Sequence, residues 1–166
     1  MAVTTQKSTE YTNVTAVPQV NIGPSEMHGR VRVAYFTHAQ SGAGDATSSV
    51  ALCQLPAGKV RLLLGSSFMY VNWTTASATL DLGWDAYTAQ DGTTTAADVD
   101  GLLDGLSVET AGLYSGEDLC TLAAVQALGG TFAFESKDGV VIRASSTDTA
   151  IVDADDLVGY LLYVVD

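Results

Sequence analysis

The sequence predicts an all-β protein, an antiparallel β-sandwich of the jelly-roll kind. At least seven short segments are rich in Val, Thr, Tyr and Phe, and most of them alternate between two faces. Gly, Pro and Ser separate these segments, and little of the chain has a helical period. A chain of 166 residues with 47% hydrophobic residues is long enough to bury one core.

The first 26 residues differ in composition from the rest. They are rich in Thr, contain Pro18 and Pro24, and show almost no apolar periodicity. We therefore expect residues 1–26 to form an extended N-terminal arm and residues 27–166 to form the sandwich.

Five strands are predicted in the first half of the sandwich. In the first of them Val31, Val33 and Tyr35 share one face, because side chains alternate along a strand. The five predicted segments are 29–38, 47–55, 59–64, 68–73 and 78–84.

Residues 89–118 are acidic and rich in glycine, which predicts a long excursion with at most one short strand near residues 106–109. Four carboxylates lie in it: Asp91, Asp98, Asp100 and Asp104. Their close spacing is similar to that of calcium loops, but the EF-hand pattern is absent. Solvated turns explain the same composition, so we expect no cofactor and keep calcium as the alternative.

Residues 115–130 are the best helix candidate. Ser115 is a suitable N-cap, Glu117 and Asp118 would lie near the positive end of the helix dipole, and Gly129 is a suitable end. The competing interpretation is a strand over residues 121–128.

Residues 131–145 are predicted to form a hairpin. A three-residue loop over 137–139 would place Phe134 opposite Ile142, whereas a two-residue Asp-Gly loop would place it opposite Arg143. Apolar matching favours the three-residue loop, because register follows the buried face.

The last strand, residues 157–165, is apolar on both faces. One face is expected to meet the sandwich core. The other carries Tyr160, Leu162 and Val164, which we predict to lie at a subunit interface, although the arm or the 89–118 segment is an alternative cover.

The charge distribution excludes several classes of partner. The net charge is −12, and residues 62–136 contain ten acids and no Lys or Arg. Such a surface repels nucleic acid and anionic membranes. The apolar run at the C-terminus is too short to cross a bilayer as a helix, and the N-terminus shows no secretory signal. Cys53 and Cys120 are expected to be free thiols.

No catalytic motif is present. The two histidines, His28 and His38, are not accompanied by a nucleophile elbow, a phosphate loop or a dinucleotide-binding motif. An enzyme would need a pocket near His38 or near the acidic segment. We therefore expect a non-enzymatic protein.

Several stretches together, "GRVRVAYFTH", "LPAGKVRLLL", "ATLDLGWDAYTAQDG", "FESKDGVVIRAS" and "LVGYLLYVVD", resemble small virion structural proteins of tailed bacteriophages. The resemblance implies a capsid decoration or cement protein on the outer head surface. It also implies a homotrimer that binds the major capsid protein and reinforces joints between capsomers. The alternative is a jelly-roll fibre or glycan-binding module for host adhesion, which would display Trp73 or Trp84 in a groove.

Overall fold

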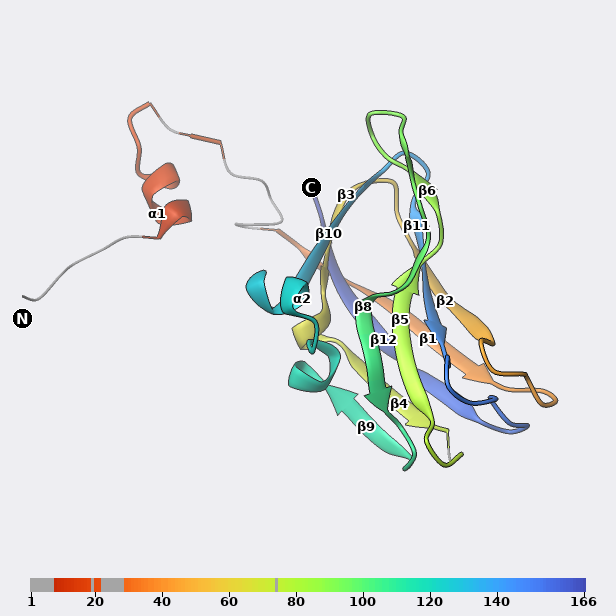
Figure 1. The fold of residues 1–166 in the computed structure, drawn as a ribbon. Coiled ribbons are helices and arrows are strands. Elements are labelled where there is room, and N and C mark those ends of the chain that lie inside the picture. Colours follow the sequence, from red (N-terminus) through yellow and green to blue (C-terminus); the bar gives the residue numbers. More distant parts are fainter. Residues whose placement is uncertain (1–7, 19, 22–28, 74) are drawn as a thin grey trace, which may run out of the picture.

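The computed structural model describes residues 8–18, 20–21, 29–73 and 75–166, and it confirms the all-β sandwich. Two antiparallel sheets face each other across one core (Figure 1). Sheet A contains β1 (Val31–Ala39), β3 (Gly58–Leu63), β4 (Phe68–Asn72), β9 (Gly112–Ser115), β10 (Thr131–Ser136) and β12 (Asp156–Val165). Sheet B contains β2 (Ser49–Leu55), β5 (Thr79–Trp84), β8 (Asp98–Ser107) and β11 (Val140–Ser145). A small separate ribbon pairs β6 (Tyr87–Thr88) with β7 (Thr94–Thr95).

The strand order is that of a jelly roll. Neighbours run β1-β12-β4-β9 in sheet A and β2-β11-β5-β8 in sheet B. Eight strands taken in chain order thus form the two four-stranded layers of a double Greek key. Strands β3 and β10 extend sheet A beside the C-terminal half of β12.

The helical elements are short. They are α1 (Thr9–Val14), the 3-10 turns η1 (Leu64–Ser66) and η2 (Gly116–Leu119), and α2 (Ala123–Ala127). Helix α1 lies within the predicted arm and away from the sandwich (Figure 1), so residues 9–14 are helical where we expected an extended chain. The predicted boundary at residue 26 falls among residues 22–28, outside the described residues. No helix in the described ranges is long and apolar enough to cross a membrane.

The helix predicted over residues 115–130 is only partly formed. Ser115 and Asp118 make a capping box, but it begins the 3-10 turn η2, and α2 starts separately after Leu122. Gly129 and Gly130 follow α2 with positive φ angles of 68° and 78°, which glycine adopts without strain. The predicted end at Gly129 is correct, and the competing strand over 121–128 is wrong.

The predicted hairpin over residues 131–145 is wrong. Both strands exist, but β10 pairs with β3 in sheet A whereas β11 pairs with β2 and β5 in sheet B. Phe134 is therefore opposite Val60, and Ile142 is opposite Cys53 and Trp84. The loop at residues 137–139 joins the two sheets. Both strands still direct their apolar side chains into the shared core, so their sequence pattern is the same as that of a hairpin.

The acidic segment also differs from expectation, because it contains the ten-residue strand β8. Its pairing with β5 is interrupted by two register shifts. Leu102 and Leu103 are both fully buried, which strict alternation does not allow. The strand is therefore irregular. Its Asp and Gly residues interrupt the apolar alternation by which a strand is predicted from sequence.

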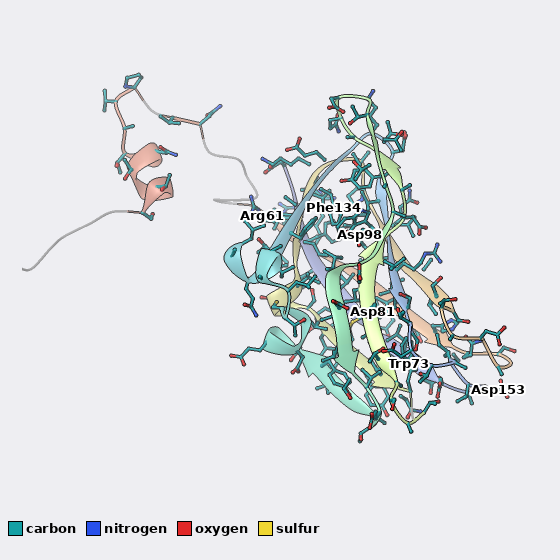
Figure 2. All side chains as sticks on the ribbon, in the orientation of Figure 1. Arg61, Trp73, Asp81, Asp98, Phe134 and Asp153 are labelled. Atoms are coloured by element: carbon teal, nitrogen blue, oxygen red, sulfur yellow. The ribbon has the colours of Figure 1, made fainter. Side chains whose placement is uncertain are left out.

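Aromatic side chains fill one part of the core. Phe134 contacts Trp84 edge-on at 5.4 Å between ring centroids and lies 5.0 Å from Phe132. Trp73 is also buried, at 1% exposure, but it lies apart from this cluster, toward the other end of the sandwich in Figure 2. Cys53 and Cys120 are both free thiols, as predicted.

Candidate interaction surface on sheet A

Strand β12 lies inside sheet A. Strand β1 runs along one of its edges for nine residue pairs, while β4 and β3 share the other edge. On the side that faces sheet B, Leu157 and Leu161 are fully buried. The predicted core face of the last strand is therefore confirmed.

The opposite side of β12 carries the three predicted interface residues. Val164 is only 5% exposed, whereas Tyr160 and Leu162 are half-buried. The Tyr160 ring stacks on Phe68, with 5.5 Å between ring centroids and 17° between planes. Neighbouring strands thus cover part of this side, and its role in subunit contact stays a prediction.

The apolar side of β12 continues across four strands. Paired residues in antiparallel strands point to the same face. One row therefore joins Tyr35, Tyr160, Phe68 and Ser115 across β1, β12, β4 and β9. We call this surface the apolar face, and it consists of Val31, Val33, Tyr35, Phe68, Tyr70, Leu113, Val158, Tyr160 and Leu162.

The apolar face is open to solvent at its two sides. Val33 is 59% exposed, Tyr35 66% and Leu113 60%. Five of the ten exposed large apolar side chains in the described residues belong to this face. Single exposed apolar residues are ordinary, but a contiguous patch of this kind marks an interaction surface.

The apolar face is also poor in acids, although the chain is strongly acidic. Asp156, at the start of β12, is the only acid within β1, β4, β9 and β12. The strands of sheet B carry four acids, Asp81, Asp98, Asp100 and Asp104, of which Asp81 and Asp98 are labelled in Figure 2. The four strands of the apolar face therefore contain fewer acids than the four strands of sheet B.

Sheet B holds its carboxylates by local hydrogen bonds. Asp81 is 3% exposed and accepts hydrogen bonds from the Gly105 N–H, at 2.7 Å, and from the Thr147 hydroxyl. Asp85 accepts two hydrogen bonds from Arg143, at 2.6 and 2.7 Å. These hydrogen bonds hold the pKa of Asp85 below its ordinary value.

The four candidate calcium ligands lie in two different elements. Asp91 lies in the turn between β6 and β7, where it accepts hydrogen bonds from the Thr93 N–H and hydroxyl at 2.8 and 2.7 Å. Asp98, Asp100 and Asp104 lie on β8, and a hydrogen bond with Asp98 raises the pKa of Asp100. Among the described residues, no three His, Cys, Asp or Glu side chains gather as a metal site. Calcium binding stays the alternative to our expectation of no cofactor, and the structure tests neither.

The aromatic groove of the glycan-binding alternative is not formed by the two tryptophans. Trp73 is buried in the core. Trp84 is half-buried against Phe132 and Phe134, and its indole N–H donates to the Ala96 carbonyl at 3.2 Å.

His38 and the four acidic positions considered for catalysis do not line either of two hollows in the described part of the chain. His38 is half-buried, and its Nε2 lies 3.2 Å from the Gln40 amide oxygen. One hollow is lined by residues around α2, including Glu117 and Cys120. A second, on sheet B, is lined by Arg143, Val99 and hydroxyl side chains. Burial raises the pKa of the Cys120 thiol, which keeps it protonated and weakly nucleophilic.

Sequence reasoning missed the width of the apolar face. The alternation along β1 places Val31, Val33 and Tyr35 on one side but does not indicate which side faces solvent. The structure buries Phe36, at 6% exposure, and turns the other three outward. Leu113 was missed because no strand was predicted at residues 112–115.

Comparison with known proteins gives likeness at the level of structure. No family model matches the chain, and no curated protein matches it. A chain of the cyanophage Pam1 capsid asymmetric unit aligns at 16% identity with a TM-score of 0.49, over 83% of this chain and 86% of that chain. A chain of the Helicobacter pylori bacteriophage KHP30 capsid aligns at 14% identity with a TM-score of 0.35, over 82% and 94%. The CBM22-1 xylan-binding domain of Paenibacillus barcinonensis Xyn10C aligns at 12% identity with a TM-score of 0.38, over 83% and 96%.

These likenesses are weak in identity and in superposition. The jelly-roll assignment therefore rests on the strand order of the two sheets. Jelly rolls serve both viral capsids and lectins, so the fold alone does not select a function.

Proposed function

We propose that this protein is a non-enzymatic virion structural protein of the decoration or cement type. It binds the outer surface of a bacteriophage head and stabilises the joints between capsomers. The observation that carries this proposal is the apolar face of sheet A, which is contiguous, exposed and almost free of acids on a chain of net charge −12. Such a face is suited to permanent contact with protein.

The charge distribution supports a position outside the head. Four acids, Asp81, Asp98, Asp100 and Asp104, lie within the strands of sheet B, on the side of the sandwich opposite the apolar face. Packaged DNA would repel that surface, whereas solvent accepts it. A protein attached to the exterior of a head can direct its apolar face toward other protein and sheet B toward solvent.

Two partners follow from this proposal. The first is the protein itself, as a homotrimer, because the apolar face stays exposed along β1 and β9. The second is the major capsid protein, and we assign contact with it to the N-terminal arm. The described arm residues Val17 and Val20 are 97% and 47% exposed, so they have little cover within this chain.

The test is to strip heads of this protein, add back the purified full-length chain, and measure occupancy and resistance of the heads to heat. We expect saturable binding to the head exterior and a higher temperature of head disruption. Failure of the full-length chain to bind stripped heads would refute the proposed function.

A further inference from the structure

The apolar face ends at two strands that have no second partner among the described residues. Strand β1 pairs only with β12, and β9 pairs only with β4. The most exposed apolar side chains of the face lie on these two strands, namely Val33 and Tyr35 on β1 and Leu113 on β9. An edge strand presents free N–H and C=O groups, which another chain can use.

The two edges carry opposite charge. On the β1 side Arg30 and Arg32 are exposed, and residues 27–44 contain no acid. On the β9 side Glu117 and Asp118 are exposed, and residues 62–136 contain no Lys or Arg. Two copies that met through the same edge would bring like charges together, whereas the β1 edge and the β9 edge attract each other.

The charges also lie at corresponding heights on the sheet. Tyr35 on β1 and Ser115 on β9 belong to the same row. Strand β9 runs antiparallel to β1, so the chain that follows Ser115 continues toward the Arg32 end of β1. Glu117 therefore lies on the Arg32 side of this row. Arg32 alternates with Val31 and Val33 along β1, and it stays exposed because β1 is an edge strand.

We propose that the β1 edge of one copy docks against the β9 edge of the next copy, head to tail. A contact between two different patches of one chain forms a closed ring when its rotation closes. The two edges carry their charged residues at the same position along the strand direction. Copies joined through these edges would therefore be related by a ring axis parallel to the strands. This inference deepens the proposed function, on which it rests, because it names the contact that would build the expected trimer.

The decisive experiment uses two variants that each disable one edge. Val33→Glu places an acid in the β1 contact, where it would face the acidic β9 edge, and Leu113→Lys places a base in the β9 contact, where it would face the arginines of the β1 edge. Their matched control is Val99→Lys on sheet B, because Val99 is 55% exposed and lies outside the apolar face. Masses are measured by sedimentation velocity at micromolar concentration, and circular dichroism confirms folding.

We expect the parent and Val99→Lys to form the ring and each edge variant alone to be monomeric. In an equimolar mixture, the unchanged β9 edge of the Val33 variant can dock against the unchanged β1 edge of the Leu113 variant. The mixture therefore forms a dimer and no larger species. A monomeric parent overturns the proposal. So does a Leu113→Lys protein that associates as the parent does, because it would indicate a two-fold contact through β1.

Charge reversal provides a second measurement that does not depend on the two edge variants. Arg32→Glu and Glu117→Arg should each weaken association by about tenfold, since rim charges tune encounter and register. Combining both in one chain again pairs opposite charges and should recover most of the loss. Absence of recovery contradicts the pairing of these two edges. Because no heads are present, this result is independent of the head-binding test: ring formation without head binding refutes the function alone, and head binding by a monomer refutes the ring alone.

Discussion

Tyr160 lies in the middle of the apolar face, in a row between Tyr35 and Phe68. Its ring stacks on Phe68, so it contributes to the folded monomer as well as to the surface. Tyr35 is its neighbour in the same row but is 66% exposed. The same residue type therefore has two roles on adjacent strands, and a matched pair of substitutions separates them.

Tyr160→Asp should lower the free energy of unfolding of the monomer by about 1–3 kcal/mol, because it removes an aromatic pair and places a charge among half-buried apolar groups. Tyr35→Asp should change it by less than about 0.5 kcal/mol, as exposed substitutions do. Urea denaturation of both variants measures the difference. Equal stabilities would show that the Tyr160 ring is not packed.

The ion pair of Asp85 and Arg143 predicts a small dependence of stability on pH. Hydrogen bonds and charge from Arg143 lower the pKa of Asp85 in the folded state. A lowered folded pKa adds stability above the unfolded value, about 3.9, and this stability is lost as the pH falls through the folded value. The pair is partly exposed, so the parent should exceed Asp85→Asn by about 1 kcal/mol at most near neutral pH. The difference should shrink toward zero below about pH 4, and a constant difference down to pH 2 would contradict this cause.

At the scale of elements, the pairing of β8 with β5 depends on Gly83. A Cβ at this position would lie 1.9 Å from the carbonyl oxygen of Asp98. The first residues of β8 therefore approach the β5 backbone more closely than a side chain allows. The two register shifts in this strand pair accompany that approach.

Gly83→Ala should destabilise the protein by about 2–3 kcal/mol, because β8 must move away from β5. Gly112→Ala on β9 is the control, since its Cβ would meet its nearest atoms at an ordinary 3.5 Å. We expect the control to stay within about 0.5 kcal/mol of the parent. Thermal melts compare the two, and similar melting temperatures would contradict the close approach.

The same elements show how far the sequence alone reaches. Periodicity identified β1 to β5 and β10 to β12, because their alternation marks the side that packs on the core. Periodicity did not identify which strands pair with one another. β10 and β11 have the same alternation of apolar residues whether they pair as a hairpin or lie in two different sheets. It also missed β8, where irregular pairing with β5 replaces alternation, and β9, which is four residues long.

The apolar face was predicted only along β12 for a related reason. Apolar residues on both sides of that strand indicated a second cover, and Tyr160, Leu162 and Val164 do lie on the outer side. The contribution of β1, β4 and β9 requires the strand order, which brings together residues far apart in the sequence. No local pattern contains that order.

At the scale of the whole molecule, the sandwich and the arm should be separable. The described part of the arm contains the short helix α1 and the exposed Val17 and Val20. Deletion of residues 1–26 should leave the melting temperature of the sandwich nearly unchanged, because the arm has too little apolar content to form a core. It should weaken binding to stripped heads. If the shortened chain binds heads as well as the parent, attachment comes from the sandwich, and our assignment of the arm is wrong.

The position of the chain in the virion tests the central claim most directly. Electron microscopy of intact virions at a resolution that distinguishes the sandwich should place it on the outer surface of the head, at the joints between capsomers, with sheet B toward solvent. Density for this chain at the tail tip, inside the head, or nowhere in the virion would contradict the account.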